Sequence, residues 1–123
     1  MATVNDLYKI TKDLMVEKGS SKIYDEPLLT NVNRLLVELF NENNYARIFN
    51  GKSKLTSPQK VTSRSDELVY EDEYVYNVLP LGLAARFFID DDLNKYTIFN
   101  TDYNNARVSA QKILSKEKLH NAI

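Results

Sequence analysis

The feature that most constrains this chain is a pair of apolar stripes between Asp72 and Leu114, joined by an acidic corner. After the corner, apolar side chains recur at alternating steps of three and four residues, as expected for one face of a helix with about 3.6 residues per turn. They are Tyr96, Phe99, Tyr103, Ala106, Ala110 and Ile113. The stripe before the corner comprises Tyr74, Val78, Leu81, Ala85 and Phe88, widened by Leu79, Leu83 and Ile89. The pattern predicts two long packed helices, the first of them at the centre of the core.

The corner between these helices consists of three consecutive aspartates, Asp90, Asp91 and Asp92. Carboxylates just before a helix accept hydrogen bonds from its free N–H groups and meet the positive end of its dipole. Clustered carboxylates could also bind a divalent cation, but this corner lacks the alternating ligand spacing and the turn glycine of a calcium loop. Helix capping is therefore the favoured interpretation, and we expect no metal or other cofactor.

The N-terminal half predicts two further helices. The first begins at a Thr3 cap paired with Asp6 and runs to about Lys18, just before Gly19. Its expected buried face is Val4, Leu7, Ile10 and Leu14. The second is expected to be capped by Asp25, with Pro27 in its first turn. Its buried face is Leu28, Val32, Leu35 and Leu39, and the polar cluster Asn41-Glu42-Asn43-Asn44 is expected to weaken the helix before a turn at Asn50-Gly51.

Residues 52–70 show no helical period and predict an extended connection. Within it, Lys60-Val61-Thr62 and Leu68-Val69-Tyr70 could form the two short strands of a hairpin. Pro80 either kinks the next helix or begins it, and we favour the kink because the apolar stripe continues upstream through Val75 and Tyr74. The predicted fold is all-α in the main: one four-helix bundle-like domain over residues 1–123, with a loop or short β-hairpin between helices two and three.

Several short motifs carry a family resemblance. They are Asp72-Glu73-Tyr74, Leu79-Pro80-Leu81-Gly82-Leu83-Ala84-Ala85, Asp90-Asp91-Asp92, and Phe99 and Tyr103 with Asn104. In this order they resemble the C-terminal half of the small head-tail connector proteins of tailed phages. Two more motifs, Val4-Asn5-Asp6-Leu7-Tyr8 and Leu35-Leu36-Val37-Glu38-Leu39-Phe40-Asn41, resemble the N-terminal helices of the same family. The resemblance covers most of the chain and includes no catalytic signature.

The resemblance implies a virion structural protein, made in the host cytoplasm and located in the neck between head and tail. It implies a ring, of twelve copies in this family, that binds the portal protein. It also implies a stopper or tail-side connector protein as a further partner. Packaged DNA would pass through the channel of the ring without sequence-specific binding.

Composition narrows the available chemistry. The 123 residues are enough for one domain that buries roughly two thirds of its unfolded surface. The chain contains no cysteine and one histidine, His120, which lies beyond the periodic part of the last helix, while Ser115 has no partner constellation. We therefore expect no enzyme. No apolar run approaches the roughly 18 residues of a membrane span, and no signal peptide is visible, so we expect no membrane contact and a protein kept inside the producing cell.

Two segments are candidate sites. Lys52, Lys54, Lys60 and Arg64 lie in a stretch without acids, directly before a run of carboxylates. As a solvated loop they would contribute only ~0.5 kcal/mol per exposed pair, whereas in a ring their repeated charge could line the channel or contact a neighbouring subunit. The second segment, residues 116–123, is predicted to be a flexible arm, with Leu119, Ala122 and Ile123 docking on the portal.

The alternative function is that of a small helical DNA-binding regulator. Such a protein gathers Lys and Arg on one recognition helix. Here Arg34 and Arg47 lie far apart on the second predicted helix, and Lys95, Arg107 and Lys112 are spread along the last. The total of 16 Lys and Arg against 17 Asp and Glu also argues against a protein whose main role is to bind nucleic acid phosphates.

Overall fold

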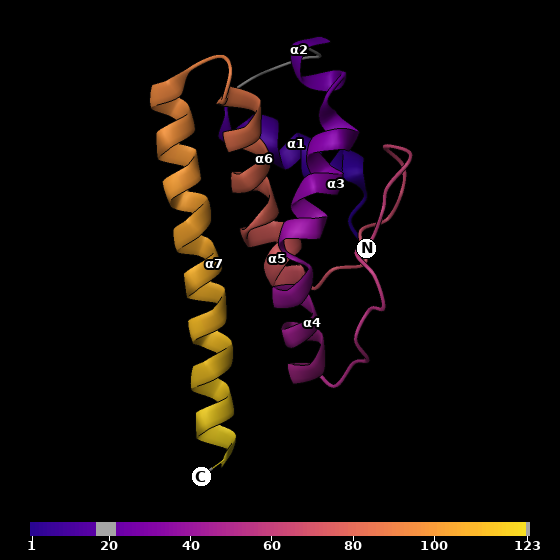
Figure 1. The fold of residues 1–123 in the computed structure, drawn as a ribbon, viewed down its shortest axis with the longest axis vertical. Coiled ribbons are helices and arrows are strands. Elements are labelled where there is room, and N and C mark those ends of the chain that lie inside the picture. The colour runs from indigo at the N-terminus through magenta and orange to yellow at the C-terminus, as the bar shows by residue number, and fades with distance from the viewer. Residues whose placement is uncertain (17–21, 123) are drawn as a thin grey trace.

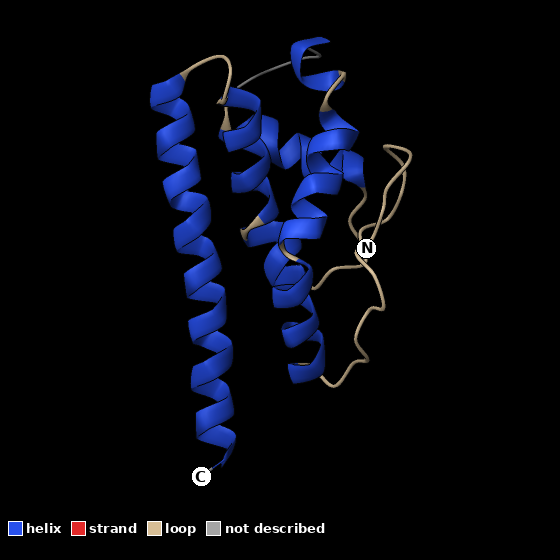
Figure 2. Cartoon of the chain, in the orientation of Figure 1, coloured by secondary structure: helices blue, strands red, loops and turns tan. Residues whose placement is uncertain are grey.

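Two helices packed side by side, α6 and α7, form one half of the molecule (Figure 1). The structure is a computed structural model that describes residues 1–16 and 22–122, without the side chains of residue 22 and residues 113–122. Its elements are α1 (Val4–Leu14), α2 (Lys22–Asp25), α3 (Leu28–Glu38), α4 (Phe40–Phe49), α5 (Asp72–Asn77), α6 (Leu79–Phe88) and α7 (Leu93–Ala122). The described residues form no strand, only one isolated bridge between Thr3 and Glu67 (Figure 2). The all-α prediction is confirmed.

The helices group into four columns, because α3 and α4 follow one another across a single residue, as do α5 and α6. Leu39 separates α3 from α4 with φ −93° and ψ 3°. Val78 separates α5 from α6, two residues before Pro80. Proline lacks an N–H and its ring collides with the carbonyl four residues earlier, here that of Tyr76, so the helix bends at this point. The kinked version of this helix is confirmed, and with it the bundle-like arrangement.

Helix α1 begins as predicted and buries a different face. Thr3 and Asp6 form a complete capping box, in which each side chain accepts a hydrogen bond from the other's backbone N–H, at 3.2 and 2.9 Å. The buried residues are Val4, Leu7, Tyr8 and Thr11, whereas Leu14 is exposed. The prediction for Leu14 was therefore wrong. The helix also ends at Leu14, short of Lys18, and the backbone leaves it through Val16 with φ 58°; Lys18 and Gly19 lie outside the described residues.

Asp25 does not cap the second long helix, contrary to prediction. It closes the short α2, where its carboxylate accepts a hydrogen bond from the Tyr8 hydroxyl. Helix α3 instead starts after Pro27 without any side-chain cap. The expected apolar face of this helix is confirmed, since Leu28, Val32, Leu35 and Leu39 are all buried.

Helix α7 packs its predicted stripe against the rest of the bundle. Tyr103 and Ala110 are buried, Tyr96, Phe99 and Ala106 are partly buried against the core, and Phe99 stacks on Phe88 with ring centroids 5.7 Å apart. Ile113 belongs to the residues whose side chains are not described. At Gly82 the bundle leaves no room, since an added Cβ would lie 2.7 Å from the Tyr103 ring and 2.9 Å from Leu35. This glycine allows α6 to approach both α7 and α3.

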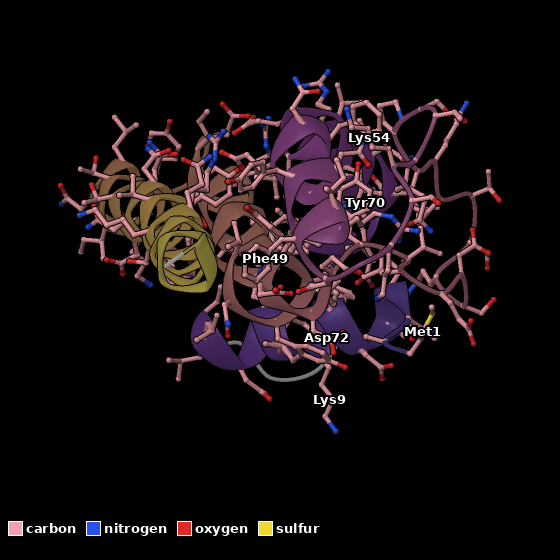
Figure 3. All side chains as sticks on the ribbon, turned by 90° about the horizontal axis from the view of Figure 1, so that it is seen from below. Met1, Lys9, Phe49, Lys54, Tyr70 and Asp72 are labelled. Atoms are coloured by element: carbon pink, nitrogen blue, oxygen red, sulfur yellow. The ribbon has the colours of Figure 1, made fainter. Side chains whose placement is uncertain are left out.

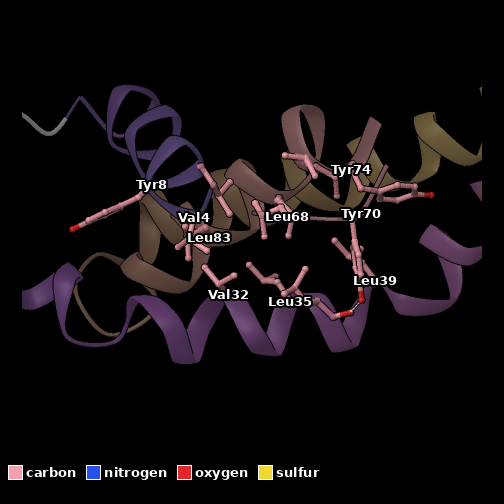
Figure 4. Packing of buried hydrophobic residues seen from close by; sticks show 14 of the residues in the cluster. Val4, Tyr8, Val32, Leu35, Leu39, Leu68, Tyr70, Tyr74 and Leu83 are labelled. Atoms are coloured by element: carbon pink, nitrogen blue, oxygen red, sulfur yellow. Dashed lines mark hydrogen bonds between the residues drawn. The ribbon is translucent and has the colours of Figure 1, made fainter. Parts of the chain in front are cut away.

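The connection between α4 and α5 also contributes to the core. Val61, Leu68 and Tyr70 are buried, and the Tyr70 hydroxyl donates to the Leu36 carbonyl (Figure 4). Residues 60–62 and 68–70 do not pair as strands, so the hairpin alternative was wrong and the loop alternative holds. The Gln59 side chain takes the place of a ladder, because it donates to the Glu67 carbonyl at 2.7 Å and accepts from the Val69 N–H at 2.9 Å.

Candidate interaction surface

The loop over residues 51–71 carries the predicted basic residues, and helix side chains hold it in place. On α3, Asn33 forms two hydrogen bonds to Val61, donating to its carbonyl at 2.9 Å and accepting from its N–H at 2.7 Å. On α4, Asn44 bonds Leu55 in the same way, at 3.0 and 2.8 Å. A side-chain amide offers one donor group and one acceptor, as a peptide group does. The loop is thus paired to the two helices as if to a neighbouring strand.

Helix α4 holds the end of the loop through a third asparagine. The Asn43 side chain is buried and its carbonyl accepts from the Glu71 N–H at 2.7 Å. The cluster of residues 41–44 therefore does not weaken the helix, as predicted, because Asn43 and Asn44 direct their amides to the loop. The sequence signal was present in the polar residues within an otherwise helical segment. Its meaning depended on partners 11 and 28 residues away.

A buried carboxylate, that of Glu71, lies where the loop meets α4 and α5. Its side chain is 4 % exposed and accepts from Lys52 Nζ at 2.9 Å, while Arg47 lies 4.0 Å away. Asn50 donates to its other oxygen at 2.9 Å. Burial opposes ionisation of Glu71, but the hydrogen bonds from Asn50 and Lys52, with the two cationic charges, lower its pKa below the ordinary 4.5. These residues line a pocket of about 620 Å³ that also reaches Met1 and Asp72.

The structure divides the four predicted basic residues into two pairs. Lys52 is bound to Glu71, and Arg64 donates to Asn5 Oδ1 at 2.9 Å with its guanidinium 5.1 Å from the centre of the Tyr8 ring. Both therefore help to hold the loop. Lys54 and Lys60 are exposed, and neither has a carboxylate partner among the described residues; Lys54 projects from the loop side in Figure 3.

The acidic corner lies at the other side of the bundle from the loop. Asp92 caps α7, since its carboxylate accepts from the Lys95 N–H at 3.1 Å, and the capping prediction is confirmed for this residue. Asp91 accepts from the Tyr24 hydroxyl at 3.4 Å. Asp90 is exposed, and it lines a shallow pocket of about 470 Å³ together with Asp91, Arg34 and Arg86. Within the described part of the chain, no three acidic or histidine side chains are grouped to hold a metal ion.

A polar network joins α7 to the α3–α4 column and was not anticipated. Arg107 on α7 bonds both carboxylate oxygens of Glu42 at 3.1 and 3.2 Å and reaches Glu38 at 3.2 Å. Glu38 also binds Arg86 at 2.8 Å and accepts from the Tyr103 hydroxyl at 2.7 Å. Burial, followed by the bond to Glu38, raises the pKa of the Tyr103 hydroxyl above its usual range. The cations of α6 and α7 thus face carboxylates of their own bundle.

The predicted portal-docking residues fall at the far end of α7. The helix continues through Ala122, so the backbone of residues 116–122 is helical in the structure. The side chains of Leu119 and Ala122, and the whole of Ile123, lie outside the described residues. Flexibility of this arm stays a prediction.

Comparison of the chain with family models, with curated proteins and with solved structures gave no match. A search of the described helices for a segment long and apolar enough to span a lipid bilayer also found none.

Proposed function

We propose that this protein is a subunit of the head-tail connector ring of a tailed phage. In this proposal it is made in the host cytoplasm, joins a ring of about twelve copies on the portal protein and remains in the virion neck. The ring then meets a stopper or tail-side connector, and packaged DNA passes through it. The protein acts by shape and contact and needs no cofactor.

The observation that carries the proposal is the position of the residues on which the resemblance rests. They occupy the points that fix this fold: Asp6 closes the cap of α1, Gly82 allows the contact with Tyr103, and Asp92 caps α7. Tyr74 and Leu83 lie fully buried between the helices (Figure 4). Motifs that are far apart in the chain therefore belong to one packed unit, which supports a shared fold as their origin.

The rigid loop supports the same proposal. Residues 51–71 contain no helix, yet paired hydrogen bonds from Asn33 and Asn44 fix their course beside the bundle. Ordering a loop costs conformational entropy of about 1–2 kcal/mol per residue. A loop held in this way can present its exposed lysines to a partner with little further loss of entropy on binding.

The alternative of a DNA-binding regulator gains no support from the helices. Arg86 and Arg107 are engaged with Glu38 and Glu42, and Arg47 donates to the loop carbonyl of Ser53 at 2.7 Å. Of the helical cations, these three are bound to groups of their own chain. A recognition helix would instead present its cations together on one exposed face.

Electron microscopy of the protein mixed with the portal from the same genome tests the proposed function. We expect an added layer of ring density on the portal, with the same rotational symmetry. A portal from an unrelated phage serves as the control and should gain no density. If the cognate portal also stays bare at micromolar protein, the connector function is wrong.

A further inference from the structure

We propose that the loop face of one copy binds the α7 face of the next, in a head-to-tail contact between copies of this chain. The loop face is the exposed side of residues 52–66 with Lys54 and Lys60. The α7 face consists of Asp90, Leu93, Ile98 and Asp102. The inference rests on the proposed function and deepens it, because a ring requires two different matching faces on each subunit.

The loop face presents cations that its own chain does not neutralise. Lys54 and Lys60 are exposed and lack a carboxylate partner among the described residues. Of the acids that follow, Asp66 is engaged with the N–H groups of Thr62 and Ser63, and Glu71 with Lys52. Glu67 lies where the loop returns to α1, at the bridge to Thr3. The amide bonds to α3 and α4 hold the face in one conformation before any partner binds.

The α7 face presents the complementary features. Leu93 and Ile98 are 70 % and 59 % exposed, large values for apolar side chains on neighbouring turns. Between Lys95 and Lys112, Asp102 is the one charged residue of α7 that is exposed, since Arg107 is turned to Glu42. Depletion of charge around exposed apolar side chains is the compositional mark of an interface core. Asp90 and Asp102 add unpaired negative charge at its edge.

The two faces lie on opposite sides of the molecule. Figures 1 and 3 both show the loop on one side and α7 on the other, with α3, α4 and α6 between them. A head-to-tail ring of many copies needs two contact faces that are nearly opposite, because each subunit turns the chain of contacts by only a small angle. The same separation prevents the two faces from pairing within one copy.

Charge alone would not make this contact strong. An exposed ion pair contributes about 0–1 kcal/mol, and charge complementarity governs register and association rate more than affinity. Leu93 and Ile98 supply the apolar area, and the lysines select the orientation. DNA in a channel is the competing partner for Lys54 and Lys60, and the experiments below separate it from a second copy.

Engineered disulfides test the contact directly, because the natural chain contains no cysteine. We pair Lys60→Cys with Asp102→Cys in one chain and oxidise the protein in concentrated solution and on the portal. We expect a ladder of covalent multimers, reduced in high salt, which screens exposed charges. The matched control pairs Asp102→Cys with Lys9→Cys, which projects from α1 on a third face of the molecule (Figure 3) and should yield mostly monomer.

Charge reversal provides the second test. Lys54→Glu with Lys60→Glu, and separately Asp90→Lys with Asp102→Lys, should each reduce cross-linking through a neutral reporter pair, Thr62→Cys with Thr101→Cys, about tenfold or more. Mixing the two reversed proteins should restore it, because each reversed face then meets its complement. Circular dichroism of each variant checks that the fold is intact. Reversal of the lysines that impairs DNA retention and is not rescued by mixing would assign them to DNA and overturn the inference.

The outcomes separate this inference from the proposed function. A ladder in solution together with a bare portal would support the contact and reject the connector function. Rings on the portal without a ladder above that of the Lys9 control would reject the contact and keep the function. Absence of the ladder under both conditions overturns the inference whatever the portal shows.

Discussion

At the scale of single residues, side-chain amides replace the β-pairing that the loop lacks. Asn33, Asn44 and Gln59 each donate to a carbonyl and accept from an N–H group of the loop. A backbone group left unpaired in a partly buried site costs about 1–3 kcal/mol. These three residues therefore determine the course of a segment that has no helix or strand of its own.

Replacing Asn44 by Ala is expected to lower the free energy of unfolding by about 1–3 kcal/mol, because the N–H and carbonyl of Leu55 lose their partner. Asn41 is the matched control. It lies on the same helix and is exposed, so Asn41→Ala should change stability by no more than about 0.5 kcal/mol. Urea denaturation measures both. Equal effects at the two positions would show that the amide does not hold the loop.

Glu71 makes stability depend on pH in acid. Its folded pKa lies below the ordinary 4.5, so the folded protein binds fewer protons than the unfolded chain as pH falls through this region. The stabilising contribution is complete above pH 4.5 and is lost as pH falls through the folded pKa. We expect Glu71→Gln to flatten this part of the curve of unfolding free energy against pH. Glu26→Gln, at an exposed turn, is the control and should leave the slope unchanged.

The residues that hold the loop could not be identified from sequence, for a physical reason. Asparagine within a helix competes with the backbone for hydrogen bonds, so the cluster at 41–44 predicted a weakened helix. Its effect reverses when a distant backbone segment supplies the partner. Likewise, Lys52 and Arg64 looked equivalent to Lys54 and Lys60 until Glu71 and Asn5 were placed beside the first two. The basic segment was predictable, whereas its division into internal and exposed cations was not.

At the scale of elements, local periodicity predicted the long helices and failed at their ends. The stripes of α3, α6 and α7 were readable because each repeats over several turns. In α1 the stripe is short, and its buried face is shifted to include Tyr8 and Thr11 because α1 crosses α6 and meets Asp25 of α2. Cap positions depend on which short helix forms next to them, as Asp25 shows. Sequence gives the interior of an element more securely than its boundary.

The contact between α6 and α7 depends on the lack of a side chain at Gly82. We expect Gly82→Ala to destabilise the protein by about 1–3 kcal/mol, since the new Cβ would lie 2.7 Å from the Tyr103 ring. Alanine is the better helix former by about 1 kcal/mol, so intrinsic propensity predicts the opposite sign. In a Tyr103→Ala background the cost should shrink or change sign. Thermal or urea unfolding of the four proteins provides this double-mutant cycle.

At the scale of the whole molecule, the polar network fixes how the columns stand relative to one another. Arg107 ties α7 to Glu38 and Glu42 at the junction of α3 and α4, and Arg86 ties α6 to Glu38. The partners are 48 to 69 residues apart, beyond the reach of any local pattern. They stabilise the bundle while leaving Asp90, Asp102, Lys54 and Lys60 for contacts outside it. The division between internal and external charge is thus a property of the assembled fold.

The C-terminal arm can be separated from the bundle by truncation. Ala110 is the last buried side chain of α7 in the part whose side chains are described. Removing residues 116–123 should therefore change the unfolding free energy by no more than about 0.5 kcal/mol. If Leu119, Ala122 and Ile123 dock on the portal, the truncated protein should nevertheless fail to form ring density on it.

A full-length control distinguishes the apolar tip from the mere length of the helix. Replacing Lys116, Glu117 and Lys118 by Ala keeps Leu119, Ala122 and Ile123 and should preserve ring formation. Replacing these three apolar residues by Ser should abolish it to the same extent as truncation. Because burial of apolar area on the portal supplies the expected affinity, charge removal and apolar removal must have opposite outcomes. Truncated protein that assembles as well as the natural chain would place the portal contact elsewhere on the bundle.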